Sequence, residues 1–295
     1  MFDRFSNRLT VQGWLVAETA LRVGTGRATE PVGTDLPVIR DELDRPFIPG
    51  SSFKGVLRAR AESLIRGVVP GNCRGACLPT GQEAERCISN TLMAKTRKQA
   101  ARQNWSDQQM TDWVWGQSCL ACRTFGSPWL ASHVQVKDLA VDTSRWFGQF
   151  QVRDGVAIDR DTETVAGVQL YNYEVVPADT RFDCQVVVDN AQAWQLGLFW
   201  LTLQPFIQGE MSLGGFRSRG LGRVRLIGPD GSQQPAMRYF SLEGEDPVAQ
   251  LIDYLGAGEE RGSPVESKQL TNWMEAFKEL LKAARGQALK EVDDA

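Results

Sequence analysis

The chain has 295 residues, of which 42% are hydrophobic and 23% are charged, and this composition is that of an ordinary folded protein. A chain of this length can bury a core without depending on disulfides. Its formal net charge of -3 excludes the general positive field that many nucleic-acid-binding proteins present. Any contact with RNA must therefore depend on local basic patches, or be shared with partner subunits.

No stretch of the sequence approaches the roughly 20 apolar residues that a membrane-spanning helix requires. The first residues, MFDRFSNRLT, also lack the apolar run of a signal peptide. We therefore expect a cytoplasmic protein that makes no contact with membranes. In a reducing compartment, the six cysteines are better interpreted as metal ligands or buried thiols than as disulfides.

The predicted elements begin with one strand within residues 9–23, followed by a glycine-rich loop and a short hairpin that ends near residue 50. A helix is then expected to run from Ser51 or Ser52, as its N-terminal cap, to about Arg66. Its predicted apolar face consists of Phe53, Val56, Leu57, Ala61, Leu64 and Ile65.

Residues 67–124 contain five of the six cysteines and are interpreted as an insertion with an anchor of its own. The patterns that follow predict a strand, an extended hairpin, a second strand and an apolar helix, at residues 132–141, 148–176, 181–189 and 191–209. A loop rich in glycine and arginine then leads into another strand, and helices are expected beyond about residue 245.

The order strand, helix, strand, strand, helix, strand is that of the ferredoxin-like (RRM-like) split β-α-β fold. The predicted fold class is therefore α+β, with this core in a domain of residues 1–230 and a helical C-terminal extension at 231–295. Because this fold carries many unrelated functions, the function must be argued from particular residues.

The cysteines of the insertion have the spacing of a metal site. Cys73-x3-Cys77, Cys87 and Cys119-x2-Cys122 offer five ligands for a four-coordinate ion. A C-x-x-C pair together with an earlier cysteine pair is typical of structural zinc, which would anchor the insertion. Free thiols are the alternative, and Cys87 is the least certain of the five ligands.

Two further residues favour structural roles. Cys184 lies in an apolar strand and is expected in the core. His133, which is the only histidine, could be a zinc ligand or a general base, but a structural role is the better prediction. A ribonuclease mechanism that needs two histidines is excluded.

The segment IPGSSFKG predicts a place for an RNA phosphate. A helix N-terminus exposes unpaired backbone N–H groups and a partial positive charge. Ser51, Ser52 and Lys54 lie in its first turn and would complete a phosphate cradle. The alternative is an ordinary helix cap with a surface lysine.

The segment GGFRSRGLGR is a second candidate for phosphate binding. Gly214 and Gly215 allow the backbone to approach a ligand closely, Arg217 and Arg219 can make charge-assisted bonds, and Phe216 offers a stacking face. An ordinary glycine-rich turn before a strand would explain the glycines, but it would not explain the alternating arginines.

Asp35 lies in a glycine-rich loop just before PVIRD, and if this loop faces RNA, an acidic side chain there weakens binding and its presence needs a reason. Its carboxylate could help to deprotonate a 2′-hydroxyl that attacks the adjacent phosphate, or could hold a divalent ion such as Mg²⁺ or Mn²⁺. The alternative is a turn aspartate that bonds its own backbone. Asp41 and Asp44 are weaker rivals that fit the hairpin better.

Three segments together resemble one family: residues 33–62 (GTDLPVIRDELDRPFIPGSSFKGVLRARAE), 122–139 (CRTFGSPWLASHVQVKDL) and 213–226 (LGGFRSRGLGRVRL). The family is the repeat-associated mysterious protein (RAMP) superfamily. Within it, the chain is similar to the backbone subunits that polymerise along guide RNA in type III CRISPR complexes. Residues 157–188 resemble the thumb hairpin and following strand of these subunits, which places the thumb at 148–176.

The resemblance covers most of residues 10–228 and implies a function. In similar proteins, the aspartate that matches Asp35 cleaves target RNA, and the thumb tip displaces one nucleotide of the guide–target duplex at regular intervals. An endoribonuclease acting within a ribonucleoprotein complex is therefore expected. Its partners would be guide RNA (crRNA), complementary target RNA and other complex subunits, including similar backbone subunits.

By the same resemblance and the chemistry above, one set of residues is expected to bind RNA. These residues are Ser51, Ser52, Lys54, Arg58, Asp159, Arg160, Gly214, Gly215, Phe216, Arg217, Ser218 and Arg219. Two alternatives stay open at this point: a backbone subunit without catalysis, and a guide-processing endoribonuclease. The single histidine and the negative net charge argue against the latter.

Overall fold

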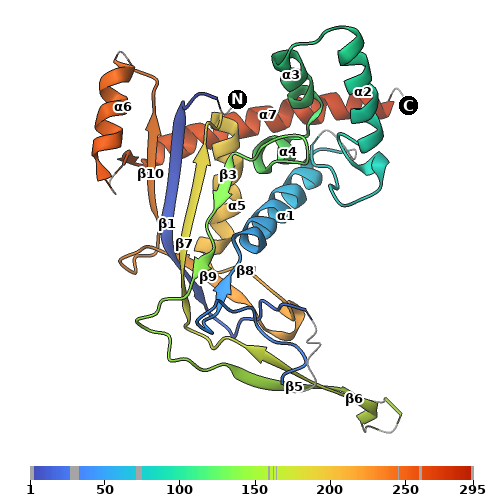
Figure 1. The fold of residues 1–295 in the computed structure, drawn as a ribbon, viewed down its shortest axis with the longest axis vertical. Coiled ribbons are helices and arrows are strands. Elements are labelled where there is room, and N and C mark those ends of the chain that lie inside the picture. The colour runs from blue at the N-terminus through green and yellow to red at the C-terminus, as the bar shows by residue number, and fades with distance from the viewer. Residues whose placement is uncertain are drawn as a thin grey trace.

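The computed structural model describes residues 3–26, 33–70, 75–158, 160–161, 163, 165–244, 246–258 and 261–293. These residues form a mixed α/β fold in which helices pack against an antiparallel sheet (Figure 1). The molecule is curved in this view, with the cysteine-rich insertion at one end of its concave side and a long hairpin at the other.

The sheet is organised around β1 (Asn7–Ala17), in which buried and partly buried residues alternate along the whole strand. On one side, β1 pairs with β7 (Arg181–Asp189), and β7 pairs with β3 (Val134–Val136). On the other side, β1 pairs with β10 (Ala236–Ser241) along its first half and with β9 (Arg223–Ile227) along its second half. All of these pairings are antiparallel. The four strands lie in the order β9-β1-β7-β3, so β1 and β7 are in the centre of the sheet.

Short strands complete the sheet and connect it to α1. β8 (Met211–Ser212) pairs with β9, and β11 (Ser263–Pro264) pairs with β10. β2 (Phe47–Ile48) pairs separately with β4 (Leu139–Ala140), next to the start of α1.

Two helices bury their apolar faces against the sheet. In α1 (Gly50–Val68), four of the six predicted apolar residues are fully buried, and in α5 (Ala193–Ile207) most of the residues are buried. The ring centroids of Phe53 in α1 and Phe206 in α5 lie 5.0 Å apart, so the two helices share one core.

Residues near the C-terminus contribute to the same core. α7 (Ser267–Asp293) packs along α5, where Gly197 is necessary because an added Cβ would lie 2.1 Å from the carbonyl oxygen of Trp273. Trp273 and Phe277 belong to the main hydrophobic cluster. A further helix, α6 (Pro247–Gly256), lies beside β10.

The insertion is helical and has a small apolar cluster of its own. It contains a 3-10 turn (Glu83–Glu85), α2 (Asn90–Arg102), α3 (Asp107–Gln117) and α4 (Leu120–Phe125). The buried members of the cluster are Ile88, Met93, Val114 and Leu130.

The predicted extended hairpin consists of β5 (Gln151–Ile158) and β6 (Val165–Val175), which pair in antiparallel fashion and project from the body of the molecule (Figure 1). Of its predicted tip residues, Asp159 lies outside the described residues. Arg160 is exposed in the turn between the strands.

Several predictions about element ends were wrong. α1 begins at Gly50 after Pro49, without a side-chain cap, so neither Ser51 nor Ser52 caps it. Instead, the Gly50 N–H donates to Asp138 Oδ1 at 2.7 Å. Asp138 also interrupts the predicted strand at 132–141, which is divided into β3 and β4. The first strand ends at Ala17, because the chain then turns into a loop that bridges from Leu21 to Val176.

None of the helices in the described part of the chain is both long and apolar enough to cross a membrane.

Candidate nucleic-acid interface and metal centre

Asp35 is fixed to strand β6 by a reciprocal pair of hydrogen bonds with Asn172. The Asp35 N–H donates to Asn172 Oδ1 at 2.7 Å, and the Asn172 N–H donates to Asp35 Oδ2 at 2.9 Å. Among the described residues, Asp35 Oδ1 accepts no hydrogen bond, and the residue is partly exposed. The carboxylate is therefore held by one oxygen, and its other oxygen can accept a proton or coordinate an ion.

Glu174, two residues further along β6, holds the chain that follows Asp35. Its carboxylate accepts hydrogen bonds from Thr34 Oγ1 at 3.2 Å, from the Val38 N–H at 3.2 Å and from Arg40 Nη2 at 2.7 Å. Its side chain is only 12% exposed, so these bonds are shielded from water. The loop that contains Asp35 is thus positioned by the hairpin on both sides of the carboxylate.

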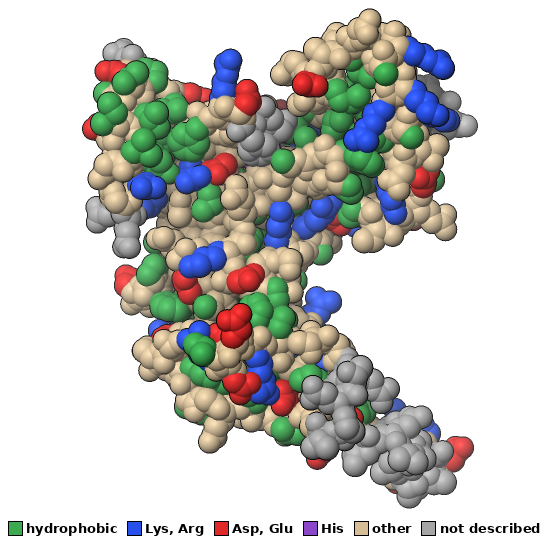
Figure 2. Space-filling view, in the orientation of Figure 1, with side chains coloured by type: hydrophobic (Ala, Val, Ile, Leu, Met, Phe, Trp, Pro, Cys, Tyr) green, Lys and Arg blue, Asp and Glu red, His purple; other side chains and the backbone are tan. Residues whose placement is uncertain are grey.

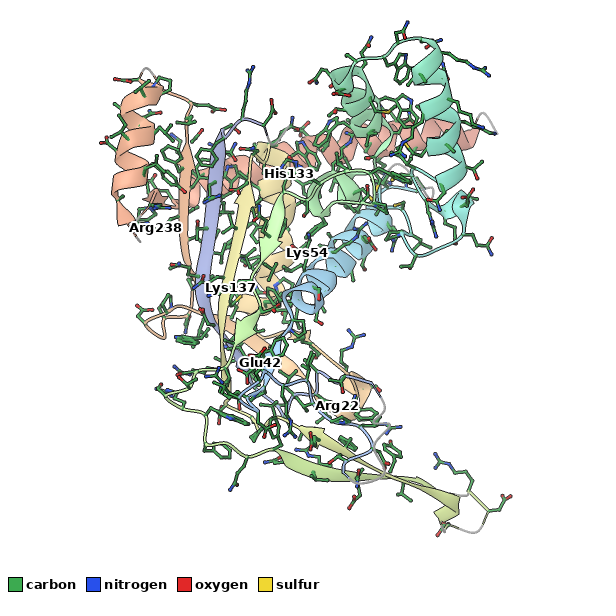
Figure 3. The ribbon with its side chains drawn as sticks, viewed as in Figure 1. Arg22, Glu42, Lys54, His133, Lys137 and Arg238 are labelled. Atoms are coloured by element: carbon green, nitrogen blue, oxygen red, sulfur yellow. The ribbon has the colours of Figure 1, made fainter. Side chains whose placement is uncertain are left out.

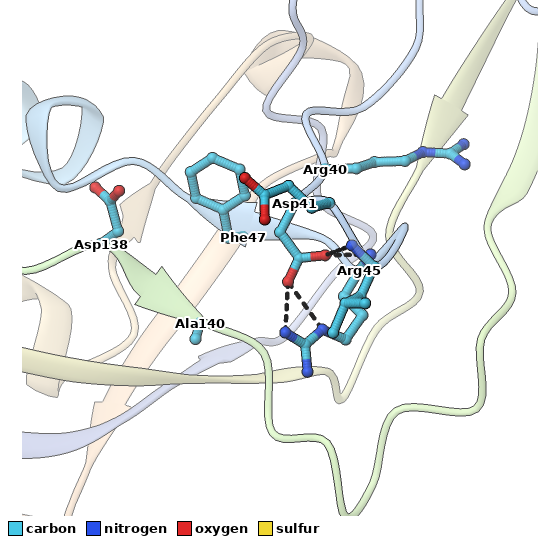
Figure 4. A pocket seen from close by; sticks show the side chains of 8 residues that line it. Arg40, Asp41, Arg45, Phe47, Asp138 and Ala140 are labelled. Carbon is cyan, nitrogen blue, oxygen red and sulfur yellow. Dashed lines mark hydrogen bonds and ion pairs between the residues drawn. The ribbon is translucent and has the colours of Figure 1, made fainter.

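The rival acids have structural partners. Asp41 accepts hydrogen bonds from the Leu43 N–H and from both the backbone and the side chain of Arg45 (Figure 4). The Arg45 guanidinium, as the largest cause, lowers the pKa of the Asp41 carboxyl. Asp44 pairs with Arg40. These two acids therefore stabilise the turn around residues 40–46, which agrees with the place in the hairpin that the sequence predicted for them. A hollow of about 480 Å³ lies beside this turn.

The glycine-arginine loop folds as a tight turn that presents its charges to solvent. Arg217, Ser218 and Arg219 form a 3-10 turn and are exposed. Gly214 has a positive φ of 81°, and a Cβ there would lie 2.1 Å from the carbonyl oxygen of Arg22, so only glycine fits. Phe216 is held in the left-handed region at φ 57°, which is costly for a bulky side chain and is typical of a functional constraint.

Aromatic contacts connect this loop to the strand that holds Asp35. The Phe216 ring centroid is 4.8 Å from that of Tyr173, and Arg219 Nη1 donates a hydrogen bond to the hydroxyl of Tyr171. The Arg219 guanidinium also lies 5.1 Å from the Phe216 ring centroid. Residues 171–173 of β6 therefore contact both the loop and Asp35, and the structure brings these two predicted elements together.

The start of α1 offers less to a phosphate than its sequence indicates. The Gly50 N–H is bonded to the Asp138 carboxylate, and the Ser52 N–H is bonded to the Pro49 carbonyl at 2.9 Å. Lys54 and Ser51 line an open hollow of about 520 Å³ between α1 and residues 125–132. Burial, followed by the charge of Arg58, lowers the pKa of Lys54. A phosphate here would have to depend on Ser51 and Lys54.

Figure 2 shows that the molecule is hollowed between the insertion and the β5–β6 hairpin, and that lysine and arginine side chains lie along this side. Lys54 and Arg22 are both labelled near it in Figure 3. Lys54, and Arg22 with its contact to Phe216 of the glycine-arginine loop, thus lie along one concave side, although the chain as a whole is slightly acidic.

Comparison with known proteins identifies the family. A family model described as the RAMP superfamily matches residues 14–225. The chain belongs to the RAMP superfamily.

Three curated relatives of this RAMP protein carry the same name. It is 27% identical to the CRISPR system Cms endoribonuclease Csm3 of Methanocaldococcus jannaschii over 227 residues, which cover 74% of this chain and 78% of that protein. Proteins with the same name from Methanothermobacter thermautotrophicus and Enterococcus italicus match shorter parts, at 38% identity over 25% of this chain and at 39% over 22%, and these parts cover 32% and 31% of the two proteins.

The RAMP protein also contains a group of cysteines that could bind a metal such as zinc. The sulfurs of Cys77, Cys87, Cys119 and Cys122 all lie within 4.8 Å of one another. Cys87, the ligand expected with the least certainty, is one of these four. Cys73, the remaining candidate, lies outside the described residues.

Backbone N–H groups and neighbouring thiols form hydrogen bonds with the sulfurs of this group. The N–H groups of Cys77 and Cys122 each donate to Cys119 Sγ at 3.4 Å. Hydrogen bonds with Cys119, and then with Cys122, lower the pKa of Cys77, whereas hydrogen bonding with Cys119 raises the pKa of Cys122. Four packed sulfurs of this kind cannot all be thiolates unless a cation lies among them.

Arg58 connects the cysteine group to α1. Its guanidinium donates to Glu62 Oε1 at 2.8 Å, to the Gly126 carbonyl at 2.8 Å and to Cys122 Sγ at 3.3 Å. These contacts involve all three of its nitrogens, so the structure places Arg58 beside the cysteine group. Its predicted contact with RNA stays a prediction.

His133 and Cys184 lie apart from the cysteine group. His133 is 1% exposed, its Nδ1 lies 2.7 Å from the carbonyl oxygen of Asp189, and burial lowers its pKa. Cys184 is fully buried in β7, and burial raises its pKa to about 12. These positions agree with the structural roles expected of both residues.

Sequence reasoning missed the residues of β6 that contact the loop of Asp35 and the glycine-arginine loop, which are Tyr171, Asn172, Tyr173 and Glu174. The segment YNYEV was interpreted only as one side of a hairpin. Aromatic and polar residues alternate in this segment, and successive side chains of a strand point to opposite faces. This alternation could have indicated that the aromatic and the polar side chains contact different parts of the protein.

Proposed function

We propose that this protein is a guide-RNA-binding backbone subunit of a type III CRISPR effector complex, and that it cleaves complementary target RNA through Asp35. The observation that carries the proposal is the position of Asp35, whose carboxylate is fixed to β6 by one oxygen beside the glycine-arginine loop. The relatives are named as CRISPR-system endoribonucleases, and the longest match covers most of both chains.

The proposed reaction needs only the RNA and one base. The 2′-hydroxyl of the target nucleotide attacks the adjacent phosphorus, while Asp35 accepts the hydroxyl proton through its second oxygen. The bond to the 5′-oxygen breaks, and that oxygen takes a proton from solvent. The products are a 2′,3′-cyclic phosphate and a 5′-hydroxyl. A bound Mg²⁺ or Mn²⁺ would stabilise the charge on the phosphate.

The same proposal gives the remaining elements a role. The antiparallel order β9-β1-β7-β3, with α1 and α5 packed on it, is the order of a ferredoxin-like core that would hold guide RNA on the concave side. The β5–β6 hairpin would act as the thumb, with Arg160 at its exposed turn, and would set the interval between cuts. The four cysteines would hold one structural zinc that anchors the insertion.

The function is tested by assembling the full-length protein with its complex and guide RNA, and by adding a complementary RNA labelled at one end. Fragments at regular intervals with cyclic phosphate ends are expected. A complex that holds guide and target but leaves the target intact would show that the chain is a binding subunit only.

Arg217 and Arg219 are expected to dominate the dependence of guide binding on salt. Each lost contact with a single-stranded phosphate reduces the slope of log affinity against log salt by about 0.7, so replacing both by alanine should reduce it by about 1.4. Because phosphates carry no sequence information, the loss should be equal for unrelated guide sequences. The measurement is guide affinity at several salt concentrations for at least three guides.

The matched control is Lys278→Ala with Lys282→Ala, which removes the same two charges from the exposed face of α7. It should leave the slope at the wild-type value. An unchanged slope in the arginine variant would show that the loop is only a turn, and a loss for one guide sequence alone would show that it recognises bases.

A further inference from the structure

Arg22 is a buried arginine that has no charged partner among the described residues. Only 9% of its surface is exposed, and burial is the sole cause that lowers the pKa of its guanidinium. Its Nε is buried and has no hydrogen-bond partner among the residues that the structure describes, where its side chain also forms no ion pair. Its contact with an aromatic ring places the guanidinium 5.3 Å from the Phe216 centroid.

The backbone holds this side chain in place from two directions. Leu21 and Val176 exchange backbone hydrogen bonds at 2.9 and 2.8 Å, which fixes the chain just before Arg22. The carbonyl of Arg22 accepts a hydrogen bond from the Gly215 N–H at 2.8 Å. The guanidinium therefore lies at the junction between the end of β6 and the glycine-arginine loop, above the β5–β6 hairpin in Figure 3.

Two glycines make the space that the guanidinium occupies. A Cβ on Gly24 would lie 2.6 Å from Arg22 Nη2, and a Cβ on Gly215 would lie 3.2 Å from Nη1. Neither residue has a positive φ in this structure, so backbone conformation does not require glycine at either position. Their lack of side chains leaves room beside the charged end of Arg22.

A buried charge without a partner is costly, and arginine cannot avoid this cost by losing its proton. Such a residue is stabilised when an anion with matching geometry binds, and the guanidinium fork matches a phosphate. The exposed turn of Arg217–Arg219 begins directly after Phe216, so a phosphate that lies over this turn is next to Arg22.

We propose that Arg22 is an RNA phosphate-binding residue, and that its guanidinium receives one phosphodiester between the turn at Leu21–Gly24 and the turn at Gly214–Phe216. This inference rests on the proposed function, because it takes the anion from RNA. The phosphate belongs either to the guide or to the target strand. Arg22 acts as an anchor that positions the strand, since no contact between Arg22 and Asp35 is present.

The test compares full-length wild-type protein with Arg22→Met, which keeps an unbranched chain and removes the charge. The probes are a labelled guide RNA alone, and a complementary RNA added to guide-loaded protein. We expect about 10- to 100-fold weaker binding of the strand that supplies the phosphate, with a salt slope reduced by about 0.7. Weakening in the first measurement assigns the phosphate to the guide, and weakening in the second alone assigns it to the target.

The melting temperature of the RNA-free protein separates binding from folding. Because Arg22→Met removes an unpaired buried charge, this temperature should stay equal or rise. A fall of several degrees would overturn the proposal in favour of a structural role. Gly24→Ala, which would displace the guanidinium, should weaken binding of the same strand. Arg285→Met, at an exposed position of α7, should change neither measurement.

Failure of the inference about Arg22 and failure of the proposed function would give different results in these binding measurements. If wild-type protein binds RNA with an ordinary salt dependence and Arg22→Met binds it equally well with the same slope, the inference about Arg22 is wrong and the proposed function stands. If the wild-type protein binds no guide, alone or with its complex, the proposed function itself is wrong.

Discussion

Asp35→Asn is expected to slow target-RNA cleavage by about 10²- to 10⁴-fold, the usual contribution of a positioned general base, and to leave guide and target affinities at wild-type values. Asparagine retains an oxygen that can accept the Asn172 N–H, so the hydrogen bonds that hold residue 35 can persist. It removes the charge and the basic oxygen. The measurement is single-turnover cleavage in the assembled complex, with both affinities determined in parallel.

The matched control is Asp44→Asn, which removes one charge from the same segment at a side chain that is 73% exposed and pairs with Arg40. It should cleave at the wild-type rate. Cleavage by Asp35→Asn at that rate, in a complex with no other active backbone subunit, would contradict the assignment.

A chelator distinguishes two roles for the carboxylate: full activity in EDTA indicates a base, and loss of activity that Mg²⁺ restores indicates an ion ligand.

The local patterns of the sequence predicted the strands and helices whose burial is regular. In β7, buried and partly buried residues alternate along nearly the whole strand, and α5 is apolar on almost every side, so periodicity and length determined both. β10 was missed because none of its residues is fully buried. Its pairing with β1 and the packing of Tyr239 on Trp273 are tertiary effects that its sequence does not contain.

The start of α1 shows how a distant residue changes a local expectation. Serine at a helix start is a strong cap signal, and the sequence offers two serines in succession. The structure uses Asp138 instead, which is 88 residues away in the sequence and satisfies the Gly50 N–H. The same acid reduces the attraction of this helix end for a phosphate, so the predicted cradle is weaker than its motif indicates.

The candidate site could be predicted in part. Resemblance pointed to Asp35 and to the glycine-arginine loop, but not to what positions them, because Asn172 is 137 residues from Asp35. Arg22 was interpreted as part of the first strand, and its unpaired charge is visible only once its surroundings are known. The spacing of Cys87 in the sequence did not show that its sulfur would lie within 4.8 Å of the sulfurs of Cys77, Cys119 and Cys122.

The second large effect is expected at the cysteine group. The protein should contain about one zinc per chain, and Cys119→Ser with Cys122→Ser should abolish zinc binding and unfold the insertion around residues 75–125. Structural zinc contributes on the order of 10–16 kcal/mol of apparent binding free energy in small peptides, and the described part of the small apolar cluster at this insertion contains only four buried residues, one of which, Leu130, follows the insertion. Elemental analysis of protein purified without chelator, and proteolysis of residues 75–125, measure the two outcomes.

Cys184→Ala is the matched control for this experiment. It also removes a buried thiol, but from the apolar strand β7, so zinc content should be unchanged even where overall stability falls. Absence of metal from the wild-type protein, or an unchanged zinc content in the double variant, would contradict the site.

Because Arg58 donates to Cys122 Sγ and to Glu62 of α1, loss of zinc should also loosen the contact between the insertion and α1. Lys54 lines the hollow at this contact, so we expect guide affinity to fall in the double variant and to be unchanged in Cys184→Ala.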